Sequence, residues 1–323
     1  ADNWLQGKLS MNQIQRVKPE DLLGRDPIKM NTERIFEGLD RKTVMVTGAA
    51  GSIGSELVRQ IANFRTVRLI LIDQAETPSF FIKAELEKEY KDVNIKMLIA
   101  DVTNKDLMER IFSIYRPDIV FHAAAYKHVP IMEENPHEAV RVNLGGTRII
   151  TDLSIKYGVK KFIMISSDKA VNPTNVMGAS KRLCELYVHS VCKDDKCLTS
   201  FVTTRFGNVL GSNGSVIPIF KKQIESGGPV TVTHPGIKRY FMTIPEACQL
   251  VLEAAFMGNG GEIFVFDMGD QISIYTLAEQ MIKLAGLTPG QDIKIEITGL
   301  RPGEKLYEEL LSDKEKTIET YHP

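Results

Sequence analysis

The sequence predicts an α/β fold: a doubly wound parallel sheet with helices on both faces, followed by a smaller lobe. From residue 40 onward, short apolar and β-branched runs alternate with segments whose apolar residues recur at helical spacing. The runs are mostly continuous, which is typical of parallel strands buried on both faces. Strands are expected at 43–47, 67–72, 95–100, 118–122, 161–166, 200–205 and 263–267, and helices at 105–115, 138–157, 175–191, 245–256, 275–285 and 304–311.

The spacing of these elements divides the chain into three parts. Residues 1–39 are polar and are expected to form an arm or linker. Residues 40–205 hold the regular alternation of strand and helix. In residues 206–323 glycines and prolines cluster in loops, so this part is expected to be mainly a substrate lobe, with 262–269 returning to the sheet.

A glycine-rich turn follows the first predicted strand. Gly48, Gly51 and Gly54 stand three residues apart, with Ser52 and Ile53 between the last two, and a helical apolar pattern follows. Glycines let the chain turn and let its backbone approach a pyrophosphate, while the helix N-terminus presents unpaired N–H groups to that anion. The stretch therefore indicates a dinucleotide-binding Rossmann-type fold, with an ordinary turn as the alternative.

The second predicted strand ends in an acid. Asp73 lies about 20 residues beyond the glycines, where a carboxylate can accept hydrogen bonds from a ribose diol. Gln74 and Ala75 follow it, so no arginine stands ready for a 2′-phosphate. The expected cofactor is NAD rather than NADP, and a turn-capping aspartate is the alternative.

Later strand ends are expected to add contacts to the same cleft. Asp101 and Val102 follow the third strand, and an acid there can reach an adenine amino group or cap the next helix. Ala123 and Ala124 follow the fourth strand and leave room for a flat cofactor. Lys127 is expected to face the same cleft as a substrate or loop contact.

The fifth predicted strand ends in Ser167, Asp168 and Lys169. Ligands of open parallel sheets bind outside the carboxyl ends of the strands. A hydroxyl, a carboxylate and an ammonium are therefore expected at the reaction site. The next helix presents Met177 and Lys181 four residues apart on one face. An ordinary polar loop and a solvated lysine are the alternatives.

The composition excludes several classes of protein. The chain has 323 residues, of which 43% are hydrophobic and 25% charged, and its net charge is −1. Such balance argues against a nucleic-acid or membrane-surface partner, and no apolar run approaches the roughly 20 residues of a membrane span. The four cysteines lack metal-ligand spacing, so reduced thiols and no metal are expected.

Several motifs together resemble the extended short-chain dehydrogenase/reductases: Thr47-Gly48-x-x-Gly51-x-x-Gly54, Asp73, His122-Ala-Ala-Ala125 and Lys181. That superfamily carries Tyr-x-x-x-Lys, and here Met177 stands in the place of the tyrosine. The stretch 166–181 is similar to that of the nucleotide-sugar 4,6-dehydratases that act on UDP-N-acetylglucosamine. Their large membrane-anchored members have Met at this position, whereas the small C5-inverting members keep Tyr. The stretch 17–25 resembles the linker after their membrane segment.

The resemblance implies roles for the matching residues. Lys181 would bind the nicotinamide ribose, Asp168 would protonate the leaving C6 hydroxyl, and Lys169 would remove the C5 proton. Ser167 would lie near the C4 oxygen. Lys169 is a base only when it is neutral, so its pKa is expected to be depressed by desolvation. Met177 cannot accept the proton of the C4 hydroxyl. Asp168, Lys169 and a relay through Ser167 are the candidates for that step.

Other segments resemble the UDP-sugar contacts of these enzymes. Asn208 matches a residue that touches the diphosphate, and Arg239, Arg301 and Glu304 lie in segments that match UDP-binding ones. Apart from the resemblance, an arginine in a Gly/Pro loop suits a diphosphate because its planar fork can bind two oxygens. A surface ion pair is the alternative for both arginines.

Taken as a whole, the resemblance implies a lyase: a UDP-N-acetylglucosamine 4,6-dehydratase of polysaccharide or capsule biosynthesis with a tightly bound, recycled NAD. Its expected product is the C5-retained (α-D-xylo) UDP-2-acetamido-2,6-dideoxy-4-hexulose. A C5-inverting dehydratase, a UDP-sugar 4-epimerase and a non-catalytic NAD-binding sensor or scaffold are the alternatives. The helices at 138–157 and 175–191 resemble the pair that dimerises the superfamily. The resemblance also implies a cytoplasmic domain, anchored to the inner membrane through a segment outside this chain.

Overall fold

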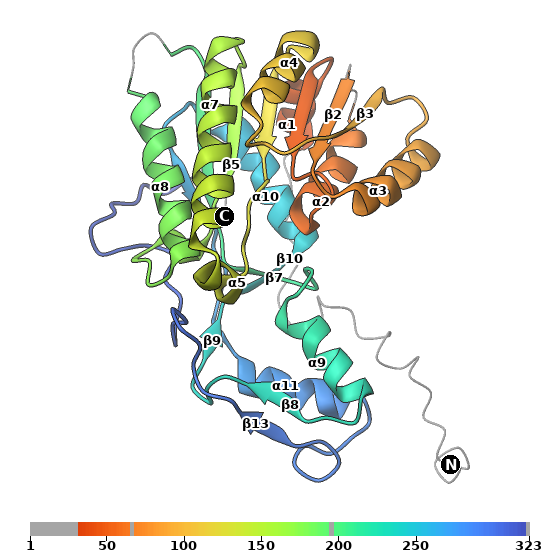
Figure 1. Cartoon of the computed structure of the whole chain (residues 1–323), viewed down its shortest axis with the longest axis vertical. Coiled ribbons are helices and arrows are strands. Elements are labelled where there is room, and N and C mark those ends of the chain that lie inside the picture. Colours follow the sequence, from red (N-terminus) through yellow and green to blue (C-terminus); the bar gives the residue numbers. More distant parts are fainter. Residues whose placement is uncertain (1–31, 65–67, 194–196, 321–323) are drawn as a thin grey trace.

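A parallel seven-stranded sheet forms the centre of the computed structural model, which describes residues 32–64, 68–193 and 197–320 (Figure 1). Its strands, in the spatial order β11-β6-β5-β4-β1-β2-β3, all pair in parallel. They are β1 Thr43–Thr47, β2 Arg68–Asp73, β3 Ile95–Ile99, β4 Ile119–His122, β5 Lys161–Ile165, β6 Ser200–Arg205 and β11 Ile263–Val265. The predicted α/β class and the seven predicted strands are confirmed. The strand order reverses between β1 and β4, where ligands of such sheets bind.

Helices cover both faces of the sheet, which explains the continuous apolar strands. Val44 and Val46 of β1 are buried in one hydrophobic cluster, and Met45 between them is buried in another on the opposite face. The first cluster lies under α1, α2, α3 and α10, and the second under α4, α7 and α8. The helices of these two layers are α1 Thr32–Leu39, α2 Ser52–Ala62, α3 Glu76–Glu89, α4 Lys105–Tyr115, α7 Thr147–Lys156, α8 Val176–Val191 and α10 Ile244–Met257.

The predicted arm ends earlier than expected. Residues 32–39 form helix α1, and its Ile35 and Leu39 are fully buried in the cluster that also contains α10. An amphipathic helix of this kind is fixed by the surface on which it packs, and a short polar sequence does not reveal that surface. The rest of the predicted arm, with the stretch 17–25, lies outside the described residues.

The predicted helix at 138–157 is a helical rod in three parts. A short α6 (Pro136–Glu138) leads into a π-helical segment, η4 (Ala139–Gly146), and then into α7. Asn143 lies in the wider π turn and is fully buried. Its side chain accepts from the Tyr126 backbone N–H at 2.8 Å and donates to Ser180 Oγ at 2.9 Å. Such π segments occur often at functional sites, and Asn143 here joins the β4 loop to helix α8.

A smaller body lies below the carboxyl ends of the strands in Figure 1. It has its own hydrophobic cluster, with contributions from α9, β8 and α11. Its elements are β7 Asn208–Leu210, α9 Val216–Glu225, β8 Val230–Val232, β9 Lys238–Arg239, β10 Phe241–Thr243, β12 Ile272–Ser273, α11 Ile274–Leu284 and β13 Ile295–Ile297. The short α5 (Val129–Glu134) packs instead on α8, where its Met132 is buried against Met177. The predicted helices at 245–256 and 275–285 are confirmed as α10 and α11.

The predicted helix at 304–311 is wrong, because this segment forms no helix. Its carbonyl groups accept hydrogen bonds from distant side chains instead of from residues one turn later. Arg239 donates to the Lys305 carbonyl at 2.8 Å, and Gln271 donates to the Glu308 carbonyl at 2.8 Å. Tertiary partners thus replace the helical hydrogen bonds that the local sequence favours.

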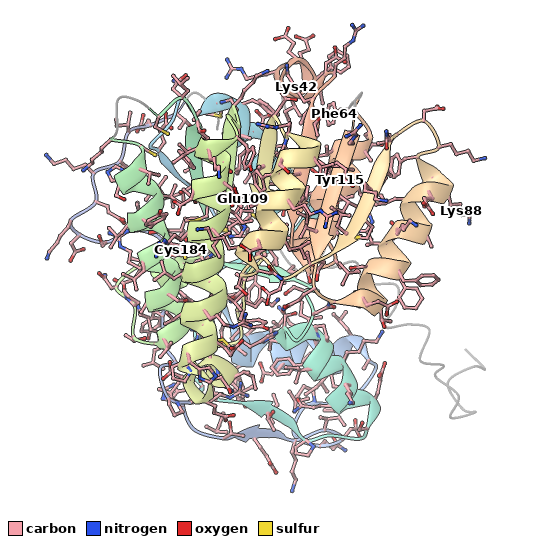
Figure 2. The ribbon with its side chains drawn as sticks, turned by 45° about the horizontal axis from the view of Figure 1, so that its top comes forward. Lys42, Phe64, Lys88, Glu109, Tyr115 and Cys184 are labelled. Atoms are coloured by element: carbon pink, nitrogen blue, oxygen red, sulfur yellow. The ribbon has the colours of Figure 1, made fainter. Side chains whose placement is uncertain are left out.

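The four cysteines are free thiols. Cys184 on α8 is fully buried in the cluster beneath α4, α7 and α8, and its side chain is labelled in Figure 2. Burial raises the pKa of the Cys184 thiol. It therefore behaves as a small core residue rather than a nucleophile.

Candidate active site

Two adjoining cavities form a cleft at the carboxyl ends of β1, β4 and β5. The larger has a volume of about 570 Å³ and the smaller about 230 Å³. Both are lined by Gly48, Gly51 and Ala123, so the glycine turn lies where they meet. The larger cavity continues between the sheet and the smaller body, where Asn208, Arg239 and neighbouring loops line it.

The glycine turn has the geometry that its sequence predicts. Gly48 has a φ of +67°, and a Cβ on it would lie 2.7 Å from the Ala124 backbone nitrogen. Only glycine fits this close approach of two strand ends. Ser52, Ile53 and Gly54 begin helix α2 and line the larger cavity. The backbone of the turn is therefore open to a ligand at the helix N-terminus.

The smaller cavity collects the predicted adenosine contacts, including Asp73, Asp101, Val102 and Ala124. The Asp73 carboxylate accepts hydrogen bonds from the backbone N–H groups of Ala50 and Ala75, both at 2.9 Å. These bonds fix Asp73 against the glycine turn while it still lines the cavity.

Asp101 does not cap the following helix, which was one of its two predicted roles. Asn104 is the N-cap of α4 and accepts from the Leu107 N–H. Asp101 instead accepts from the Thr103 N–H at 2.8 Å and from Arg141 at 3.0 Å. Burial raises the pKa of Asp101, but these hydrogen bonds outweigh it and hold the pKa below its usual value.

The predicted reaction group lies at the end of β5, in the 3-10 turn η5 (Asp168–Ala170). Asp168 is fully buried, and its Oδ1 accepts from Ser167 Oγ at 2.9 Å and from Lys169 Nζ at 3.0 Å. Lys169 also donates to Asn208 Oδ1 at 3.1 Å. Ser167 and Lys169 line the larger cavity, whereas Asp168 lies behind them.

The expected depression of the Lys169 pKa is wrong. Burial lowers the pKa of this ammonium, but the carboxylates of Asp168 and Glu308 outweigh that effect and raise it. Glu308 was not among the predicted site residues, although its Oε1 lies 3.7 Å from Lys169 Nζ. The segment 304–311 was predicted only as a helix, and a local helical pattern does not indicate which distant residue Glu308 lies beside.

Helix α8 presents Met177 and Lys181 to the larger cavity, as predicted. Both are almost fully buried, so Lys181 is not a solvated helix charge. Lys181 Nζ donates to the Ile165 carbonyl at 2.6 Å, and burial lowers the pKa of its ammonium. Between them, Gly178 allows α8 to approach η5, since a Cβ there would lie 2.2 Å from the Lys169 carbonyl oxygen.

The remaining predicted substrate contacts also line the larger cavity: Lys127, Asn208, Arg239, Arg301 and Glu304. Lys127 is exposed along it, and partial loss of hydration together with the charge of Lys169 lowers its pKa. Arg301 is exposed as well. Arg239 is 8% exposed and lies 3.6 Å from Glu304, so its ion pair is not the surface pair that was the alternative.

His122 at the end of β4 has a structural environment. Its ring lies between Thr47 Oγ1 at 2.7 Å and Thr147 Oγ1 at 3.0 Å. Complete burial, with a smaller contribution from the charge of Lys181, lowers its pKa to about 3. The neutral imidazole therefore fixes β4 to β1 and α7 over the whole physiological pH range.

Within the described part of the chain, no group of three or more His, Cys, Asp or Glu side chains is placed to hold a metal ion. Among those same residues, no helix has the length and apolar character needed to span a membrane.

Comparison with known proteins matches residues 44–323 to the family described as polysaccharide biosynthesis protein. The capsular polysaccharide biosynthesis protein CapD of Staphylococcus aureus is 52% identical over 96% of this chain and 52% of its own length. The probable polysaccharide biosynthesis protein EpsC of Bacillus subtilis is 50% identical over 100% of this chain and 54% of its own length. The chain therefore spans about half the length of these two relatives.

More distant relatives carry the names of two different enzymes. The UDP-N-acetylglucosamine 4,6-dehydratase (inverting) of Campylobacter jejuni is 34% identical over 86% of this chain and 80% of its own. A UDP-glucose 4-epimerase of Rickettsia canadensis is 35% identical over 85% of this chain and 79% of its own. Sequence identity by itself does not separate elimination from epimerisation here.

Solved structures support the fold. Pen from Bacillus thuringiensis superimposes with a TM-score of 0.79 at 39% identity, covering 85% of this chain and 83% of its own. DesIV is a dTDP-glucose 4,6-dehydratase from Streptomyces venezuelae whose structure contains NAD. It superimposes with a TM-score of 0.73 at 20% identity, covering 84% of this chain and 89% of the DesIV chain. At that identity the second likeness supports the fold alone.

Proposed function

The chain belongs to the polysaccharide biosynthesis protein family, and we propose that it is a nucleotide-sugar 4,6-dehydratase acting on UDP-N-acetylglucosamine. The reaction comprises oxidation at C4, loss of water across C5–C6 and return of a hydride to C6. One observation carries the proposal: the hydrogen-bonded group of Ser167, Asp168 and Lys169 at the wall of the larger cavity. Elimination needs both an acid and a base there, and this group contains a carboxyl and an amine.

The cleft fits NAD. Gly48, Gly51 and Gly54 place no side chain between the cavity and the N-terminus of α2, where a pyrophosphate would bind, and the fixed Asp73 carboxylate suits the adenosine ribose. Lys181 would hold the nicotinamide ribose from α8. When bound, NAD supplies the acceptor for the C4 hydride and later returns that hydride to C6. The residues of the chain bind it, orient it and move protons.

Proton transfer would run through Ser167, the member of the group that both lines the cavity and donates to Asp168 Oδ1. We assign to Asp168, acting through the Ser167 hydroxyl, the uptake of the C4 hydroxyl proton that Met177 cannot take. The protonated Asp168 then returns a proton through Ser167 to the leaving C6 oxygen. Lys169 removes the C5 proton that the C4 ketone has acidified.

The larger cavity has suitable partners for a UDP-sugar. Asn208, Arg239 and Arg301 face the diphosphate in this proposal, and Arg301 has no ion-pair partner within 4.0 Å among the described residues. Its exposed guanidinium is therefore free to bind two phosphate oxygens. Lys127 and Glu304 complete the assigned substrate contacts.

Methionine at position 177 favours C5 retention, because the resemblance links this residue to the retaining enzymes. It disfavours epimerisation because it offers no proton acceptor beside C4.

A homodimer is proposed through α7 and α8. Leu183 and Leu186 on α8 are 46% and 50% exposed, which suits a helical interface. The expected membrane anchor and cytoplasmic position stay predictions.

The deciding experiment is a reaction with UDP-N-acetylglucosamine in D₂O without added NAD, followed by mass spectrometry and proton NMR. We expect a product lighter by one water, with a C6 methyl group and deuterium at C5, and with retained C5 configuration. An inverted C5 centre would assign the inverting dehydratase. A C4-epimerised sugar without water loss would assign the epimerase. Absence of turnover with NAD⁺ added would contradict dehydration of this substrate.

A further inference from the structure

We propose that Glu308 is the proton store of the reaction, taking the proton from Lys169 so that Lys169 can act as the C5 base. This inference rests on the proposed function and adds to it a residue that acts through Lys169. It answers a problem that the site itself poses. In the structure Lys169 is ion-paired with two carboxylates, and an ammonium cannot remove a proton from carbon.

The position of Glu308 fits this role. Its side chain is 4% exposed, and Oε1 lies 3.7 Å from Lys169 Nζ and 3.9 Å from Arg239 Nε. Its second oxygen, Oε2, is buried without a hydrogen-bond partner, as is Asp168 Oδ2. A carboxylate with an unused buried oxygen is costly when charged and is relieved by protonation. The charged groups that face Glu308 are Lys169, Asp168, Arg239 and Lys305.

Glu308 also differs from Asp168 in its access to the cavity. Asp168 is linked to the cavity through Ser167, whereas Glu308 lies at ion-pair distance from Lys169 and does not line the cavity. Burial raises the pKa of Glu308, and the neighbouring ammonium of Lys169 opposes this only in part. The two carboxylates can therefore serve two separate proton transfers at the same time.

The C-terminal segment holds Glu308 in place from several sides. Gln271 donates to the Glu308 carbonyl at 2.8 Å, and Lys305 donates to the Val171 carbonyl beyond η5 at 3.0 Å. Arg205 donates to the Leu310 carbonyl at 3.0 Å. The non-helical path of this segment is thus what brings a carboxylate to Lys169.

Every proton that these residues take up during one turnover is also returned. The cycle begins with Asp168 and Glu308 ionised and Lys169 protonated. Oxidation at C4 sends the hydroxyl proton to Asp168, which removes the first counter-ion of Lys169. An N–H bond of Lys169 then breaks and an O–H bond forms on Glu308. Neutral Lys169 takes the C5 proton, while Asp168 returns its proton to the departing water.

The last step restores the starting state. As the hydride returns to C6, the protonated Lys169 gives its proton back to C5. Glu308 then returns the stored proton to Lys169. No oxidant or reductant beyond the bound nicotinamide is needed, and the net loss is one water.

The test compares the wild type with Glu308→Gln and with Glu309→Gln, which removes an exposed carboxylate from the adjacent position. We expect Glu308→Gln to lose about 10²-fold or more in turnover at neutral pH. Because Lys169 must then release its proton to solvent, this loss should shrink as the pH rises. Reduced nicotinamide should also accumulate in the variant after substrate is added, because C4 oxidation precedes the blocked step. Glu309→Gln should behave as the wild type.

A second readout does not depend on turnover. The pKa of Lys169 is measured from the pH dependence of its acetylation by acetic anhydride, followed by peptide mass spectrometry. Removing the Glu308 charge should lower that pKa by about one to three units, and Glu308→Asp should largely preserve it. An unchanged Lys169 pKa overturns the proposal, as does a loss of turnover that is equal at every pH. If the wild type fails to dehydrate the substrate, the proposed function fails, and the acetylation result still decides whether Glu308 controls Lys169.

Discussion

The fully buried guanidinium of Arg205 binds the carboxylate of Glu315 through two hydrogen bonds, Nη1–Oε2 at 2.8 Å and Nη2–Oε1 at 3.0 Å. On its other side Arg205 binds Glu185 of α8 at 2.8 Å. One side chain at the end of β6 thus joins the sheet, a helix and the C-terminal segment. That segment carries Glu304 and Glu308 into the candidate active site.

We expect Glu315→Gln to lower the free energy of unfolding at pH 7 by about 2 kcal/mol, since it removes one partner of a fully buried arginine. Urea denaturation measures the difference, and the exposed Glu319→Gln serves as control. Hydrogen bonds from Arg205 lower the pKa of Glu315 from 4.5 to about 2. The stabilisation is therefore complete above 4.5 and is lost as the pH falls toward 2. A difference between the two proteins that does not narrow in this range would contradict the assignment.

Lys169→Met should bind NAD and UDP-N-acetylglucosamine but should not exchange the C5 proton, because the amine that takes this proton is gone. Turnover should fall by about 10²- to 10⁴-fold. Deuterium incorporation at C5, read by NMR, is the direct measurement. Lys314→Met removes an exposed lysine and is the matched control. Normal turnover of Lys169→Met would eliminate Lys169 as the base.

Gly178→Ala should disturb the reaction group without touching any of its side chains. The added Cβ would lie 2.2 Å from the Lys169 carbonyl oxygen, so η5 or α8 must move. Relieving this clash should shift the reaction group, and such a shift should cost about 10²-fold in turnover. Gly145→Ala is the control, because its Cβ would meet nothing closer than 3.7 Å. Equal activity of the two variants would show that the η5 position does not govern turnover.

Met177→Leu should keep nearly full activity. The side chain is 2% exposed and packs with Met132 and Ala139, and a volume-conserving exchange in such a cluster costs less than about 1.5 kcal/mol. No proton transfer is assigned to the thioether. Steady-state kinetics and thermal unfolding are the measurements. A loss as large as that of Lys169→Met would assign a direct part in the reaction to Met177.

NAD⁺ should bind more tightly than NADP⁺, because Asp73 would repel a 2′-phosphate. Asp73→Ser should narrow this difference while the hydroxyl still accepts one of the two backbone hydrogen bonds that Asp73 now receives. Fluorescence titration of cofactor-free protein measures both affinities. Preference of the wild type for NADPH would show that Asp73 does not face the adenosine ribose.

The sequence by itself determined the sheet and the place of the site. Residues such as Val44, Met45 and Val46 are apolar on both faces of β1, and only a doubly covered parallel strand satisfies that pattern. The glycine turn at Gly48 could be predicted because such a turn needs a positive φ. The position of Asp168 and Lys169 could be predicted because they follow a strand at the ligand-binding edge of the sheet. Each of these features depends on residues that are close together in the chain, so it can be predicted from their spacing.

Only the tertiary structure decided the surroundings of Lys169. Glu308 comes from a segment that the local pattern assigned to a helix, but hydrogen bonds from Arg205, Arg239 and Gln271 hold that segment in a non-helical path. The pKa of Lys169 is raised for the same reason, because a carboxylate 139 positions further along the chain lies 3.7 Å away. In the segment 304–311 such non-local partners outweigh the local helical propensity. At Lys169 they outweigh the effect of desolvation on the pKa. Both effects depend on residues that come together only when the chain has folded.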